Sequence, residues 1–209
     1  RTLRSIENMK SWMDDVIIVI VNDGPNPPKT SWLHPFNIYL INTQNKQWTN
    51  PEPAYNIGIQ AAIDHGADTL IIQNAENYHV GDIIGRAAQI TDNEWLSFAC
   101  YSINKAVTFS YFDIHNVIEN NNHGATHDGE NAWYNHSIHR PVGYDFCAAM
   151  RTETMLKLNG YDERFSLGCG YGDDDLLRRA RLFGVDFKII DDPFVVHQWH
   201  YTGEGVPAN

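Results

Sequence analysis

The chain of 209 residues is long enough to bury one sizeable core, and its composition is ordinary for a globular domain. Its formal net charge of −11 argues against double-stranded nucleic acid as a partner, because that ligand is held largely by Lys and Arg. Three scattered cysteines exclude a disulfide framework and a cysteine-rich zinc site. The longest apolar run is too short to cross a bilayer, and no signal peptide opens the chain. We therefore expect no transmembrane segment and a cytoplasmic location, either free or peripheral to a membrane.

Apolar residues in the first half of the chain alternate between helical and strand-like spacing. The predicted helices cover residues 2–12, 54–66 and 81–90, and the predicted strands cover residues 16–21, 36–41, 69–72 and 95–100. The run at 16–21 is continuous and β-branched, which is typical of a strand buried on both faces of a parallel sheet. This alternation predicts an α/β fold with a mostly parallel central sheet flanked by helices. Nucleotide-binding domains of this kind normally open with a strand, so we expect a first strand to be missing before the helix that begins near Arg1.

The second half is irregular at first and becomes regular again toward its end. Residues 119–127 read as a long loop, which in a compact domain is typically functional or mobile. A strand is then expected over residues 144–150, helices over 152–159 and 173–183, and closing strands over 185–190 and 194–196. We treat residues 1–209 as a single domain.

Polar side chains follow the strand that ends at Ile72. Asn74 and Glu76 are separated by one residue, so both oxygens could reach the same hard cation, and Mg²⁺ and Mn²⁺ favour oxygen ligands. A polar loop after a strand would give the same pattern. Asn22 and Asp23 likewise follow a strand, where they could contact a base or ribose or could simply form a turn.

Three consecutive carboxylates, Asp173 to Asp175, open the last predicted helix after a glycine-rich stretch. Capping and the helix dipole would need only one or two acids. A carboxylate held here could accept a proton from an acceptor hydroxyl.

Histidines occur in pairs near the end of the chain. His197 and His200 follow a closing strand and could supply a metal ligand and a phosphate donor, or could be surface residues. Two further pairs, His123 with His127 and His136 with His139, could suggest zinc, but no matching cysteine set accompanies them.

Taken in order, these segments resemble the family 2-like glycosyltransferases of the GT-A (Rossmann-like) fold over almost the entire chain. The motifs that carry the resemblance are Val19–Gly24, Asn50–Gly58 as "N-P-x-x-A-R-N-x-G", Asn74–Glu76 as "D-x-D", Asn159–Phe165 as "G-[FY]-D-E-x-F" and Gly172–Arg179 as "E-D-x-D-L-x-x-R". Three departures stand out: Asn74 replaces the first acid of the metal motif, Tyr55 replaces an arginine and Gly172 replaces a glutamate.

The resemblance implies transfer, with inversion, of a sugar from a UDP- or GDP-type nucleoside-diphosphate sugar to a glycan hydroxyl, with Mn²⁺ or Mg²⁺. Residues 1–100 would form the nucleotide-sugar half and residues 101–209 the acceptor-binding and catalytic half. Asp173 would be the base, with Asp174 beside it, and Asn74, Glu76 and His197 would hold the metal. The remaining implied contacts are Asn22, Asp23, Asn56, Asn74, Trp199 and His200 for the donor, and Trp133, Tyr144, Asp162 and Glu163 for the acceptor. The alternatives are a non-catalytic nucleotide-sugar- or glycan-binding domain and a zinc-dependent hydrolase.

Overall fold

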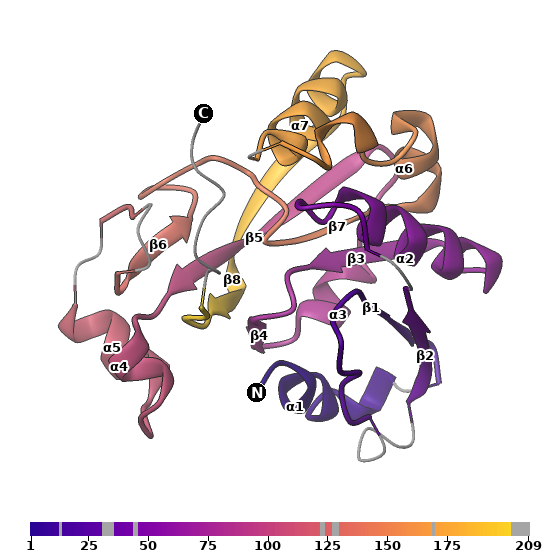
Figure 1. The fold of residues 1–209 in the computed structure, drawn as a ribbon. Helices are drawn as coiled ribbons and strands as arrows, with labels where there is room; N and C mark the ends of the chain where they lie inside the picture. Colours follow the sequence, from indigo (N-terminus) through magenta and orange to yellow (C-terminus); the bar gives the residue numbers. More distant parts are fainter. Residues whose placement is uncertain are drawn as a thin grey trace.

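A computed structural model describes residues 1–12, 14–30, 36–43, 46–121, 124–126, 130–168 and 170–201. Within these ranges the chain is mixed α/β, with a two-stranded sheet, a curled six-stranded sheet and helices packed on them (Figure 1). His123, His127 and Cys169 lie outside the described residues.

The first half contains helices α1 (Thr2–Glu7), η1 (Lys10–Trp12), α2 (Glu52–Asp64) and α3 (Ile83–Ala87), and strands β1 (Ile17–Asn22), β2 (Asn37–Asn42), β3 (Thr69–Gln73), β4 (Asn77–Val80) and β5 (Glu94–Ser102). The second half contains helices α4 (Lys105–Thr108), α5 (Ile114–Asn120), α6 (Thr152–Leu158), η2 (Glu163–Phe165) and α7 (Gly172–Leu182), and strands β6 (Ala132–Asn135), β7 (Cys147–Arg151) and β8 (Asp186–His197). The two predicted closing strands are therefore one strand, and the helix predicted over residues 2–12 is broken between α1 and η1.

The six-stranded sheet is mixed, and the expectation of a mostly parallel central sheet is not met. Its order is β3-β7-β5-β8-β4, with β6 paired to β5. Only β5 and β8 pair in parallel in this sheet, while the pairs β3–β7, β5–β7, β4–β8 and β5–β6 are antiparallel. The parallel pair β1–β2 forms a separate sheet. The expectation rested on the alternation of helices and strands, which does not determine the direction in which β7 enters the sheet.

The strand directions still gather polar residues at one edge of the sheet. Since β7 is antiparallel to both β3 and β5, and β8 is parallel to β5, strands β3, β5 and β8 run the same way. Their carboxyl ends share an edge, which is where ligands bind in α/β sheets. Strand β7 begins at that edge because it runs the opposite way. Helices α2 and α7, which return the chain to the starts of β3 and β8, also begin there (Figure 1).

Buried side chains from both faces of the sheet hold these elements in place. One apolar cluster, which includes the fully buried Trp95, joins α2, α6 and α7 to β3, β5 and β7. A second cluster packs α3 against the opposite face of β5 and β7. Every residue of β5 is buried, as expected for a central strand. Strand β1 differs from the prediction, because all six of its residues are only half-buried.

No helix in the described ranges combines the length and the apolar character needed to cross a membrane.

Candidate functional site

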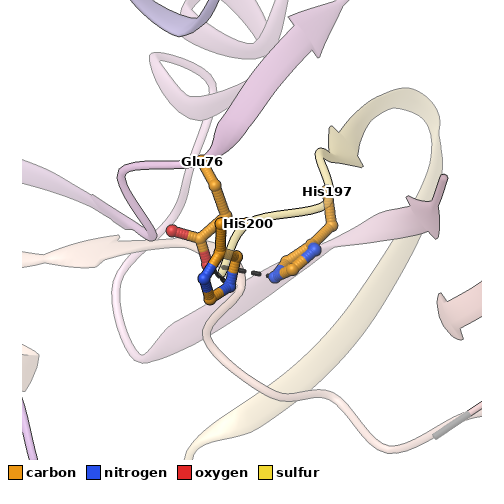
Figure 2. A group of neighbouring side chains, drawn as sticks. All are labelled: Glu76, His197 and His200. Atoms are coloured by element: carbon orange, nitrogen blue, oxygen red, sulfur yellow. Dashed lines mark ion pairs between the residues drawn. The ribbon is translucent and has the colours of Figure 1, made fainter. Parts of the chain in front are cut away.

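Three side chains at the carboxyl edge of the sheet could hold a metal ion together. Glu76 follows β3, His197 ends β8 and His200 lies three residues further on (Figure 2). The Nε2 atoms of His197 and His200 lie 3.0 Å and 3.7 Å from Glu76 Oε1. One ligand atom from each residue lies within 4.8 Å of the other two. His200 was predicted at the donor rather than at the metal, and the structure brings it into this group.

Contacts from neighbouring segments hold the Glu76 backbone. The Gln198 side-chain amide donates a 2.6 Å hydrogen bond to the Glu76 carbonyl. Thr2 at the start of α1 donates from Oγ1 to the Ala75 carbonyl at 2.8 Å. In the antiparallel pair β4–β8, Asn77 lies opposite His197. The loop is therefore fixed between α1 and the end of β8 before any ion binds.

The charge state of Glu76 suits a cation ligand. Burial alone would raise the pKa of this carboxyl, but the hydrogen bond and the charge of His197, with smaller help from the Glu76 amide and His200, outweigh burial and lower the pKa. The carboxylate is therefore ionised at neutral pH and negative, as divalent-cation coordination requires.

The side chain of Asn74 contacts helix α2. Its Oδ1 accepts a 2.7 Å hydrogen bond from the hydroxyl of Tyr55, the residue that replaces arginine in the resembling motif. The ring of Tyr55 stacks on Tyr161 with centroids 4.9 Å apart. The Tyr161 hydroxyl in turn donates to the carboxyl of Asp145. The predicted role of Asn74 at the metal stays a prediction.

Four acidic side chains act on the hydroxyl of Tyr55. Burial raises its pKa first, and the charges of Asp145, Glu76, Asp173 and Glu52 add to the increase. Because electrostatic interactions weaken with distance, Glu76 of the potential metal group and Asp173 of α7 both count among the acids near this tyrosine.

The start of α7 presents its first two acids differently. Burial, followed by the charge of Asp174, raises the pKa of Asp173 above its usual value. Asp174 accepts a 2.8 Å hydrogen bond from the hydroxyl of Tyr144, whose pKa rises to about 12 through burial and the acidic neighbours. A half-buried carboxyl with a raised pKa can accept a proton, so the geometry of Asp173 is compatible with a general base.

Asp145 is a buried acid that sequence reasoning missed. Burial raises its pKa to about 6, against the lowering effect of Tyr161, with further increases from Asp173 and Glu52. Its carboxyl therefore keeps its proton in the folded protein at pH values where it is lost in the unfolded chain. Stability from this group is present below pH 3.8, the ordinary Asp value, and is lost as pH rises through about 6.

Replacing Asp145 with Asn should therefore remove a pH-dependent penalty. At pH 7 the variant should be more stable than the wild type by up to about 3 kcal/mol, because each pKa unit is worth about 1.4 kcal/mol. At pH 4 the two proteins should differ much less. Urea unfolding at both pH values measures the difference, with exposed Asp14→Asn as control. A stability difference that is the same at pH 4 and pH 7 would contradict the assignment.

The predicted donor residues outside this cluster are engaged with other protein groups. Asn22 donates to the Gly24 carbonyl and to Asn42 Oδ1 at 3.1 and 3.0 Å. Burial would raise the pKa of Asp23, but hydrogen bonds from Lys46 and Trp48 outweigh it and lower that pKa. Their roles in nucleoside contact remain predictions.

Asn56 and the predicted acceptor residues Asp162 and Glu163 make contacts within the protein. Asn56 accepts from the Tyr161 amide at 2.8 Å and donates to the Tyr161 carbonyl and Glu163 Oε1, both at 2.9 Å. Asp162 caps η2 and accepts from Arg164 Nε at 2.9 Å. These contacts fasten α2 to the loop before α7, so Asn56 has a clear positioning role in the fold.

The three aromatic residues predicted to contact the donor or the acceptor lie in three different environments. Trp133 is 6% exposed and packs edge-on against Tyr101, so the structure does not bring its ring to the metal group. Trp199 is half-buried, with Lys105 Nζ 4.6 Å from its ring centroid. Tyr144 is directed toward α7 through Asp174.

The His136 and His139 rings lie 4.5 Å apart, and His136 Nδ1 is 3.7 Å from Asp191. Across the described part of the chain, the group around Glu76 is the one that meets the geometric condition for three metal ligands.

Sequence reasoning missed four residues of this site: Glu52, Tyr55 as a site residue, Asp145 and Tyr161. Glu52, Tyr55 and Tyr161 stand inside the quoted motifs Asn50–Gly58 and Asn159–Phe165, so their positions were a usable signal. Asp145 was not marked, because a single acid beside a strand is a common surface pattern.

Comparison of the chain with known protein-family models finds no match, and comparison with curated proteins finds none either.

Proposed function

We propose that this protein is a GT-A type glycosyltransferase, which moves a sugar from a UDP- or GDP-type donor to a hydroxyl of a glycan acceptor with inversion. The observation that carries the proposal is the arrangement around Tyr55. The charges of Glu76, one of the three potential metal ligands, and of the half-buried Asp173 both act on its hydroxyl. The motif order along the chain adds to this support.

In this proposal Asp173 removes the proton from the acceptor hydroxyl as that oxygen attacks the anomeric carbon. The new oxygen–carbon bond forms while the bond from that carbon to the diphosphate oxygen breaks, and the diphosphate leaves with the electron pair. Tyr144 would orient Asp174 beside the acceptor, and Tyr55 would hold Asn74 at the donor side. General-base help of this kind typically contributes about 10²- to 10⁴-fold to a rate.

The residues present fit a divalent cation, which Glu76, His197 and His200 would hold through one carboxylate and two imidazoles. Bound there, Mn²⁺ or Mg²⁺ would neutralise charge on the departing diphosphate. Mg²⁺ strongly prefers oxygen ligands. Two imidazoles therefore favour Mn²⁺ between the two, and His200 adds a ligand to the set without replacing the negative charge that Asn74 lacks.

A thermal-shift panel of nucleotide sugars, each with and without Mn²⁺, tests the proposal. A ligand that binds only the folded state at about 100 times its Kd stabilises the protein by about 2.7 kcal/mol, so the true donor should raise the Tm by several degrees. We expect one nucleotide class to do so only when Mn²⁺ is present. No shift with any nucleotide would contradict the proposal.

The panel, donor hydrolysis and metal analysis together separate the alternatives. A binding domain would show the shift but no Mn²⁺-dependent hydrolysis of the donor. A zinc hydrolase would carry tightly held, stoichiometric zinc by metal analysis and would not respond to nucleotides.

A further inference from the structure

Glu52, the first residue of α2, is a buried acid whose role the proposed reaction leaves open. Its side chain is 4% exposed. Within the described ranges its Oε2 atom has no hydrogen-bond partner. Buried carboxyl oxygens are nearly always paired, so an unpaired one calls for an explanation.

The carboxyl of Glu52 lies directly against the start of α7. A Cβ atom added to Gly172 would be 2.0 Å from Glu52 Oε1 and 2.8 Å from its carboxyl carbon. Only glycine at position 172 leaves room for this carboxyl. The next residue in the chain is Asp173, whose charge contributes to raising the pKa of Glu52, after burial.

The position of Glu52 is fixed by contacts on either side of it. The amides of Thr49 and Asn50 donate to the Ser166 carbonyl at 2.8 and 3.0 Å, and the Asn50 side chain donates to the Phe165 carbonyl at 2.9 Å. The side chain of Asn56, one turn into α2, donates a hydrogen bond to the Tyr161 carbonyl and accepts one from the Tyr161 amide. The Glu52 carboxyl therefore stays beside α7 rather than turning to solvent.

We propose that Glu52 and Asp173 form a coupled carboxyl pair at the start of α7, with Glu52 acting as a positioning residue for Asp173. Two carboxyls in one partly dry site cannot both ionise readily, so the second proton is held more tightly than the first. The charge of Asp173 acts on Glu52 and Tyr55 from α2, on Tyr144 and Asp145 before β7 and on Tyr161 before η2, and the charge of Asp174 on α7 acts on Asp173. These groups are acidic or phenolic, and the guanidinium of Arg140 lies 5.9 Å from the centroid of the Tyr144 ring. The use of the pair in transfer rests on the proposed function, whereas the pairing itself does not.

Carboxyl ¹³C NMR titration of the full chain tests the pairing without any substrate. In the wild type, the signals of Glu52 and Asp173 should each show two inflections at shared pH values. In Glu52→Gln, Asp173 should titrate in a single step, with full ionisation reached about one pH unit lower or more. Gly172→Ala should also shift the Asp173 titration to lower pH. The added methyl group displaces the Glu52 carboxyl, and Glu52 keeps its charge.

Exposed Glu153→Gln on α6 removes the same charge elsewhere and should leave the Asp173 titration unchanged. An Asp173 curve in Glu52→Gln that superimposes on the wild-type curve would overturn the pairing. If Glu52→Gln changes the titration but no donor is ever transferred, the pairing stands and the proposed function fails. If transfer occurs, its pH profile should move with the Asp173 titration in Glu52→Gln, and an unmoved profile would overturn the positioning role.

Discussion

Replacing Asp173 with Asn is expected to lower sugar transfer by about 10²- to 10⁴-fold while donor binding stays nearly unchanged. The amide keeps the size of the side chain and its place at the start of α7, but it cannot take the proton of the acceptor hydroxyl. The contacts to the donor diphosphate that we propose lie at the Glu76 group and do not include Asp173, so the Kd for the nucleotide should hold. Initial rates give the loss of transfer, and calorimetric titration of the donor gives the Kd.

Asp14→Asn, an exposed change of the same kind, serves as the control for that experiment and should retain full activity. Equal losses of transfer and donor affinity in Asp173→Asn would mean that Asp173 supports the site structurally. A variant with undiminished transfer would remove Asp173 from the mechanism.

Replacing Glu76 with Gln is expected to weaken Mn²⁺ binding by at least about 10- to 100-fold. Losing a residue that only orients a metal ligand typically costs that much, and Glu76 would be a ligand itself. The substitution removes the one formal negative charge of the three ligands, and no carboxylate at position 74 can compensate for it. Calorimetric titration with Mn²⁺ alone measures the effect without a nucleotide. Mn²⁺-dependent transfer should fall with it.

Glu153→Gln should bind Mn²⁺ as the wild type does, which controls for the loss of one charge from an acidic protein. Unchanged Mn²⁺ affinity in Glu76→Gln would place the ion elsewhere. Metal analysis of the purified protein is a useful companion, since two imidazoles and a carboxylate also suit zinc.

Most of the regular structure was predictable because local patterns determine it. The strand at residues 69–73, the central strand at 94–102 and the helices beginning at Thr152 and Gly172 follow directly from apolar spacing and glycine stops. The direction of the strands was not predictable, because β7 owes its antiparallel place between β3 and β5 to contacts far apart in the sequence. The short strands β4 and β6 carry too few residues to show a period.

The potential metal group was partly predictable. Glu76 and His197 were named from their positions after strands, whereas His200 joined them only through the turn that follows β8. The predicted acceptor contact of Trp133 shows why an aromatic residue is hard to assign from sequence. An aromatic residue in a polar stretch can be a ligand platform or a core residue, and Trp133 lies in the core. The four acids that act on Tyr55 come from four separate segments, so no local pattern predicts the group.

A crystal structure with Mn²⁺ and an unreactive nucleotide-sugar analogue would test the arrangement on which everything else depends. We predict that the ion binds Glu76, His197 and His200, that the diphosphate lies on it, and that Asp173 faces the anomeric carbon of the sugar. An ion bound away from Glu76, or a sugar with no access to Asp173, would contradict the account.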